Sequence, residues 1–136
     1  MIKKDFKICE NSNDILHLSP VRCCHKISFY INKHKFNVIN LHLHHLVGKD
    51  EDIIRHHSID MILKWIDLTT SPEDTQIILG DFNTPPNSLT YNFLIKNNYK
   101  SIYLEKNKEE PKETFHGKLI APYADNDFPL TCDFIL

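Results

Sequence analysis

The segment Gly80-Asp81-Phe82-Asn83 constrains this chain most, because it follows the apolar run Ile77-Ile78-Leu79 and precedes two prolines. An apolar run closed by glycine and then by proline predicts a buried strand that ends in a loop. In α/β proteins, ligands bind at that carboxyl edge of the sheet. Side chains alternate along an extended backbone, so we expect Asp81 and Asn83 to face a pocket while Phe82 packs inward.

A second strand is predicted over residues 36–43, where alternation places Asn40 and His42 on one face. Residues 26–31 show a similar strand pattern, and the four polar residues 32–35 separate the two runs. This arrangement predicts an antiparallel hairpin that carries His42.

A helix is predicted between these strands and the strand at 76–80. Apolar residues recur at helical spacing at Ile59, Ile62, Leu63 and Ile66. Acidic residues 50–52 suit the positive end of its dipole, and Ser71-Pro72 ends it. The alternation of strands and helices indicates an α/β fold.

The remaining segments give weaker patterns. We expect a helix from Asn87 or Ser88 to Asn97, a strand over 99–104, and a solvated charged loop over 106–113. Residues 1–25 are predicted to be mostly irregular, with a short strand over 14–18.

The composition is that of one globular domain. The chain has 136 residues, 41% of them hydrophobic and 25% charged, and a formal charge of −2. Such a balance gives no global positive field to gather nucleic acid, so any polyanion binding must be local.

The four cysteines, the absence of an export signal and the absence of a long apolar run all predict an intracellular setting, cytoplasmic or nuclear. The cysteines are expected to be reduced packing groups.

Three motifs in order resemble the endonuclease/exonuclease/phosphatase superfamily, which includes deoxyribonuclease I. They are Asn40-Leu41-His42-Leu43, Gly80-Asp81-Phe82-Asn83 and Asp133-Phe134-Ile135-Leu136. The resemblance is clearest over residues 26–136. It implies a four-layer α/β sandwich of the deoxyribonuclease I type, of which residues 1–136 would form a single partial domain, the carboxyl-terminal half.

The resemblance also implies a divalent-metal-dependent phosphodiester hydrolase, a nuclease or phosphoesterase, that uses Mg²⁺ or Mn²⁺. Its implied catalytic residues are His42, Asp81, Asn83 and Asp133, and the last three would also bind the metal. Asn40 and His116 would contact substrate. The substrate would be a phosphodiester in nucleic acid, phospholipid or nucleotide, and the oligomeric state stays open.

Two features of the superfamily have no counterpart in this sequence: a metal-binding glutamate on an early strand and a terminal Ser-Asp-His segment. Glu10 is the one glutamate before His42, and its surroundings differ from that strand. We therefore expect the 136-residue chain alone to have negligible activity, as a fragment of a longer gene product would. The alternative is a catalytically inactive remnant that acts as a binding module.

Blander interpretations of the site residues also stay open. Asp81 and Asn83 could simply cap the turn before the prolines, because both residue types favour such positions. Asp133 could be a strand-end residue that accepts backbone hydrogen bonds. A zinc site could form from His42, His44 and one of His56 and His57.

Overall fold

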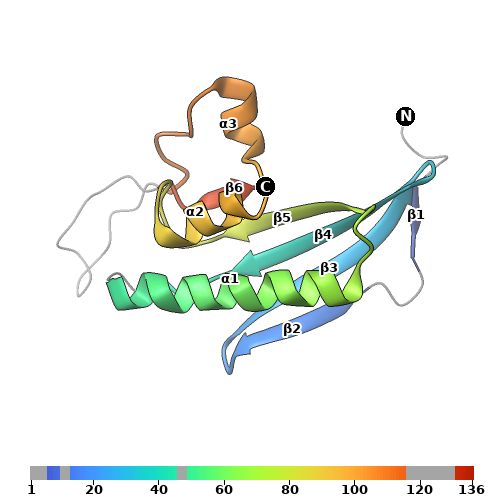
Figure 1. Ribbon diagram of the computed structural model, residues 1–136, viewed down its shortest axis with the longest axis horizontal. Coiled ribbons are helices and arrows are strands. Elements are labelled where there is room, and N and C mark those ends of the chain that lie inside the picture. Colours follow the sequence, from blue (N-terminus) through green and yellow to red (C-terminus); the bar gives the residue numbers. More distant parts are fainter. Residues whose placement is uncertain (1–5, 10–12, 46–48, 116–130) are drawn as a thin grey trace.

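A mixed β-sheet with two helices along one face forms the body of the protein (Figure 1). The computed structural model describes residues 6–9, 13–45, 49–115 and 131–136. In chain order the described elements are β1 (Phe6–Ile8), β2 (Asp14–Ser19), β3 (Arg22–Ile31), β4 (His34–His42), α1 (Lys49–Thr69), β5 (Thr75–Asp81), α2 (Leu89–Lys96), α3 (Ile102–Asn107) and β6 (Asp133–Ile135).

The strands lie in the order β1-β3-β4-β5-β6, and β2 pairs with β3. β3 and β4 form the predicted antiparallel hairpin, with a tighter connection than expected. Ile31 pairs with His34, so only Asn32 and Lys33 turn the chain, and Asn32 adopts the left-handed φ of 58°. β4 and β5 are parallel and are joined through α1, whereas β5 and β6 are antiparallel. The α/β prediction is confirmed.

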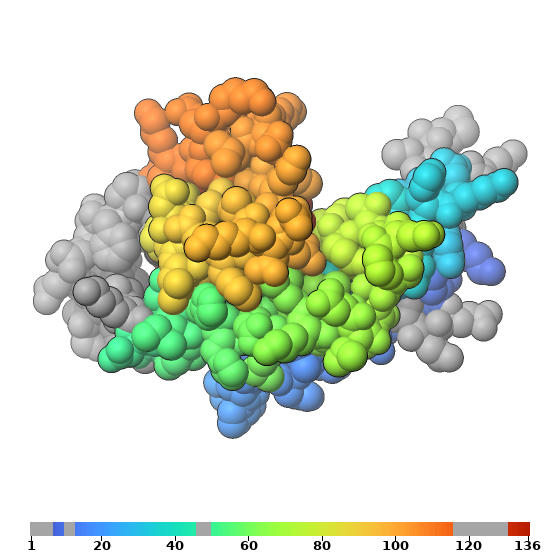
Figure 2. All heavy atoms as spheres, viewed as in Figure 1, coloured from blue at the N-terminus to red at the C-terminus, as the bar shows by residue number. Residues whose placement is uncertain are grey.

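Helix α1 has the predicted amphipathic form. Asp50, Glu51 and Asp52 occupy its first turn. Its apolar stripe is buried in one core with residues from β4, β5 and α2, which include Ile39, Leu41, Ile78 and Leu94. Figure 2 shows α1 and α2 side by side over this face, with α3 projecting beyond α2. None of the helices among the described residues is both long and apolar enough to cross a membrane.

The amino-terminal prediction was right about a strand over 14–18, which is β2, but wrong that the rest is irregular, because β1 and the start of β3 also lie before residue 26. Two of the β3 residues that point into the core, Lys26 and Ser28, are polar. Lys26 is 2% exposed, with its Nζ 3.0 Å from Asp14 Oδ2 and 2.6 Å from Thr69 Oγ1. Pairing is what allows a buried charge, and this lysine joins β2 and β3 to the end of α1.

The strand predicted over 99–104 was also wrong, because α3 begins at Ile102. The Ser101 hydroxyl accepts a hydrogen bond from the Leu104 amide and caps that helix. Such a cap gives a hydrogen-bond acceptor to an amide of the first helical turn, which has no partner within the helix, and so favours a helix over a strand at this point. The charged loop is not purely solvated either, since α3 extends to Asn107 and Glu110 accepts hydrogen bonds from Tyr91 and Ser101.

The face of the sheet opposite α1 is apolar and exposed in the part of the chain that the structure describes. Because directly paired residues share a face, the register assigns several exposed residues to it. They are Ile8, Ile15, Ile27, Ile31 and Ile135. The described residues thus form a helix layer and a sheet layer.

Cys23 and Cys24 test this assignment of faces. Burial raises the pKa of the Cys24 thiol to about 11, whereas Cys23 is exposed on the other face. Since the thiolate is the nucleophile, iodoacetamide at pH 8 should label Cys23 and spare Cys24 in the folded protein. Peptide mass mapping checks this, with denatured protein as the control in which both react. Equal labelling of the two thiols in the native state would contradict the register.

Gly80 tests the β4–β5 pairing. Its φ is +127°, and a Cβ at this position would collide with the carbonyl oxygen of Leu41 on β4. We expect Gly80→Ala to lower the free energy of unfolding by about 2–4 kcal/mol, because it adds both backbone strain and a clash. Urea unfolding measures the loss, with Thr75→Ala at the exposed start of β5 as the control. A loss no larger than the control's would show that the backbone is relaxed here.

Candidate active site at the carboxyl edge of the sheet

Three polar residues lie in one row across the sheet where β4 and β5 end and β6 begins. His42 pairs with Asp81, and Asp81 pairs with Asp133. Directly paired residues on neighbouring strands share a face, so the three side chains emerge on the same side. Residues far apart in the sequence thus meet at one edge.

Asp81 stands at the centre of this row. Its Oδ1 accepts a hydrogen bond from the Asn83 backbone amide at 2.8 Å, and its Oδ2 lies 3.6 Å from His42 Nε2. One oxygen therefore caps the turn, as the blander interpretation predicted, while the other faces a histidine. The His42 side chain is 54% exposed and that of Asp81 is 33% exposed, so ligands can reach both.

Phe82 and Asn83 fix the loop that leaves β5. Phe82 is buried and packs edge-on against Phe134, as the alternation predicted. Asn83 has a left-handed φ of 50°, so strand alternation no longer decides where its side chain points. Its Nδ2 donates to the Leu43 carbonyl oxygen at 2.9 Å, which ties this loop to the end of β4.

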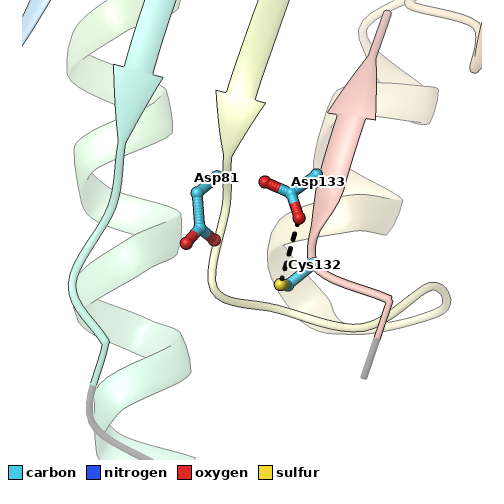
Figure 3. A group of neighbouring side chains, drawn as sticks. All are labelled: Asp81, Cys132 and Asp133. Carbon is cyan, nitrogen blue, oxygen red and sulfur yellow. Dashed lines mark hydrogen bonds between the residues drawn. The ribbon is translucent and has the colours of Figure 1, made fainter. Parts of the chain in front are cut away.

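Asp133 brings a second carboxylate next to Asp81, with Cys132 beside them (Figure 3). Ligand atoms of the three residues all lie within 4.8 Å of one another. Burial, with the nearby Asp81 carboxylate, raises the pKa of the Cys132 thiol to about 12. The thiol therefore stays protonated at neutral pH, and the two carboxylates are the anionic groups of this cluster. Their exposed oxygens are the donors that Mg²⁺ and Mn²⁺ prefer.

The other candidate residues occupy different positions. Asn40 is exposed on the same face, where it pairs with Leu79 two residues before His42. His44 Nε2 lies 2.7 Å from Glu51 Oε2, and the His56 ring packs on Phe93. Within the described ranges, neither histidine joins His42 in a metal-binding group, which removes the support for a zinc site. His116 lies outside the described residues.

Asp52 in the first turn of α1 holds the loop after β5. Its Oδ1 accepts hydrogen bonds from Thr90 Oγ1 at 2.7 Å and Thr84 Oγ1 at 3.2 Å, and its Oδ2 accepts from the Leu89 amide at 3.0 Å. Both threonines are fully buried. The neighbouring Arg55 donates to the His44 carbonyl oxygen at 3.2 Å, so one helical turn anchors the segments after both β4 and β5.

Asp52 and Cys132 were not identified from the sequence. An acidic residue in the first turn of a helix is ordinary, so Asp52 gave no signal beyond the dipole. Cys132 directly precedes Asp133, but the alternation of a strand would send the two side chains to opposite faces. Their proximity depends on the carboxylate, whose Oδ2 turns to within 3.6 Å of the thiol.

Comparisons with known proteins point to one fold. No protein-family model and no curated protein matches the sequence. Among solved structures, the chain is similar to the human Nocturnin catalytic domain with bound sulfate, at 18% identity and a TM-score of 0.74, over 98% of this chain and 48% of that one. An endonuclease/exonuclease/phosphatase from Bacteroides vulgatus matches at 20% identity and a TM-score of 0.71, over 98% and 54%.

TDP2 from D. rerio, in complex with a single-stranded DNA product, matches at 14% identity and a TM-score of 0.65, over 96% of this chain and 52% of that one. The chain thus spans about half the length of the structures it matches. At these identities the likeness concerns the fold. The resemblance to the superfamily is confirmed at that level, and the chain has a deoxyribonuclease I-like α/β fold.

Asp52→Ala tests the anchor of the loop after β5. The change removes the Asp52 Oδ1 acceptor of the buried Thr84 hydroxyl and leaves the buried Thr90 hydroxyl only the longer bond to the backbone carbonyl oxygen of residue 52, at 3.2 Å. We therefore expect a loss of about 2–4 kcal/mol in the free energy of unfolding. Asp50→Ala is the control, since Asp50 shares the same helical turn but is exposed, and should cost no more than about 1 kcal/mol. Urea denaturation compares the two variants. Equal losses would mean that Asp52, like Asp50, stabilises the protein only through its charge near the helix N-terminus.

Proposed function

We propose that this chain belongs to the endonuclease/exonuclease/phosphatase superfamily and carries one wall of a divalent-metal-dependent phosphodiester hydrolase site. The observation that carries the proposal is the row His42, Asp81 and Asp133, which the strand register brings to one edge. Asn83 lies on the adjoining loop. The shared fold supports the assignment, because sheet edges of this kind place ligands at the carboxyl ends of strands.

The proposed metal ligands are Asp81, Asn83 and Asp133. The two carboxylates supply hard oxygen donors, and the Asn83 carboxamide can add its oxygen, because its nitrogen is the atom that bonds to the Leu43 carbonyl. A bound Mg²⁺ or Mn²⁺ would neutralise charge on the substrate phosphate and polarise it for attack.

The proposed role of His42 is to donate a hydrogen bond to a phosphate oxygen. Its Nε2 lies 3.6 Å from Asp81 Oδ2, so the ring stands beside the carboxylate that would hold the metal. Asp81 would also orient the attacking water, through the oxygen that the Asn83 amide leaves available. Asn40 lies near enough on the same face to contact the substrate, and we assign a second substrate contact to His116.

The substrate class that the site supports is a phosphodiester, in nucleic acid, phospholipid or nucleotide. The site offers a histidine and a metal-binding carboxylate pair, which together suit a phosphate group in any of these. A net charge of −2 gives no preference for long polyanions. The DNA product bound to TDP2 is consistent with one of the three classes.

A second candidate function is a binding module that keeps the fold without catalysis. The apolar sheet face opposite α1 favours it, since exposed apolar patches mark interaction surfaces. This candidate requires no metal at Asp81 and Asp133, which separates it from the hydrolase.

Metal binding by the 136-residue chain tests the proposal. We expect Mn²⁺ to bind weakly, on the order of 1 mM, and to broaden the amide NMR signals around residues 81 and 133. Asp81→Asn and Asp133→Asn should each remove this broadening, because each deletes a charged ligand. Asp67→Asn, an exposed aspartate on α1, should leave it unchanged. Mn²⁺ binding that survives both site variants would refute the proposed site.

Hydrolysis of bis(p-nitrophenyl) phosphate in Mg²⁺ or Mn²⁺ gives the second readout. We expect a negligible rate from this chain alone, since loss of a metal ligand and a general base costs several orders of magnitude. A measurable rate that Asp81→Ala abolishes would support the hydrolase and contradict the expected inactivity. Glu10 and His116 would then be the first residues to examine for the missing roles.

A further inference from the structure

A short strap, residues 110–114, runs from the end of α3 to the entrance of β6. Its first part is fixed to the core. The Glu110 carboxylate accepts hydrogen bonds from the hydroxyls of Tyr91 and Ser101, and both of those residues are buried. The Thr131 hydroxyl donates to the Pro111 carbonyl oxygen. The strap therefore approaches β6 from a fixed position.

Thr114 at the other end of the strap contacts the backbone of the candidate site. Its Oγ1 accepts hydrogen bonds from the backbone amides of Cys132 and Asp133, each at 3.0 Å. Its hydroxyl also points to Cys132 Sγ, 3.9 Å away. A hydroxyl has one donor and two acceptor positions, and in Thr114 each has a partner.

The pairing of β6 explains why Asp133 needs such a partner. Ile78 and Leu136 exchange both backbone hydrogen bonds. In an antiparallel pair only every second residue bonds to the neighbouring strand, and the residues between them direct their amides away from it. Asp133 lies three positions before Leu136, and its amide therefore points away from β5. The Thr114 hydroxyl supplies the acceptor that a further strand would otherwise provide.

We propose that Thr114 is a positioning residue for the carboxylate pair of the candidate site. It acts through the backbone of Asp133, holding that residue in register with Asp81 so that their oxygens can share one cation. This inference rests on the proposed function, because it assigns Thr114 a role in metal binding. Neighbours that orient metal ligands commonly change metal affinity 10- to 100-fold when they are lost.

Three variants test the proposal in the full 136-residue chain. Thr114→Val keeps the shape but removes the acceptor, whereas Thr114→Ser keeps the hydroxyl. Thr131→Val is the matched control, because it makes the same substitution in the other hydroxyl that joins the strap to the start of β6. Thr114→Ala replaces Thr114→Val should the valine variant fail to fold.

Amide hydrogen exchange by NMR gives the first readout, and it needs no metal. We expect Thr114→Val to speed exchange at Cys132 and Asp133 at least about tenfold, with residues of α1 unchanged and Thr114→Ser close to wild type. Unchanged exchange at both amides would overturn the proposal, since the hydroxyl would then not hold them.

Mn²⁺ affinity from NMR line broadening gives the second readout. Thr114→Val should weaken binding about tenfold, while Thr114→Ser and Thr131→Val stay within about twofold of wild type. Equal weakening by Thr131→Val would assign the effect to the strap as a whole and overturn the role of Thr114. If wild type binds no Mn²⁺, the proposed function and the metal-directed role both fail, and the exchange data decide the backbone contact separately.

Discussion

The parallel pairing of β4 with β5 is the contact on which the rest of the site depends. At its end, Leu41 lies directly opposite Gly80, and the absence of a side chain at Gly80 lets the Leu41 carbonyl approach its Cα. That close approach keeps the two strands in register for one further pair, His42 and Asp81. In the sequence Gly80 only marks the end of a strand. In the structure it allows the pairing that places His42 opposite Asp81.

Helix α1 links this pairing to the loops beyond it. The stripe of isoleucine and leucine on α1 packs on the sheet, while its first turn contacts the segments that follow β4 and β5. Asp52 and Arg55 make those contacts, so hydrophobic packing along the helix and polar anchoring at its end act on the same edge. The crossover helix thus supports the site as well as the core.

The two faces of the sheet have different roles. On the α1 side, even the charged Lys26 is buried, since Asp14 and Thr69 supply its partners. On the other side, apolar residues remain exposed, and the polar row lies at one end of that face. Exposed apolar residues gathered on one face are typical of a surface that contacts another group.

Local sequence determined the elements whose patterns are strong: α1 from its 3.6-residue apolar repeat, the β3–β4 hairpin from two strand-like runs joined by polar residues, and β5 from its apolar run closed by glycine. It also indicated Asp81 and His42, because motif order identifies them without geometry. Tertiary structure decided the rest. β3 buries polar residues that find partners across the fold, and α3 forms where Ser101 caps it. The contacts of Asp52 and Thr114 likewise join residues distant in sequence, and local pattern cannot specify them because they depend on how the elements pack.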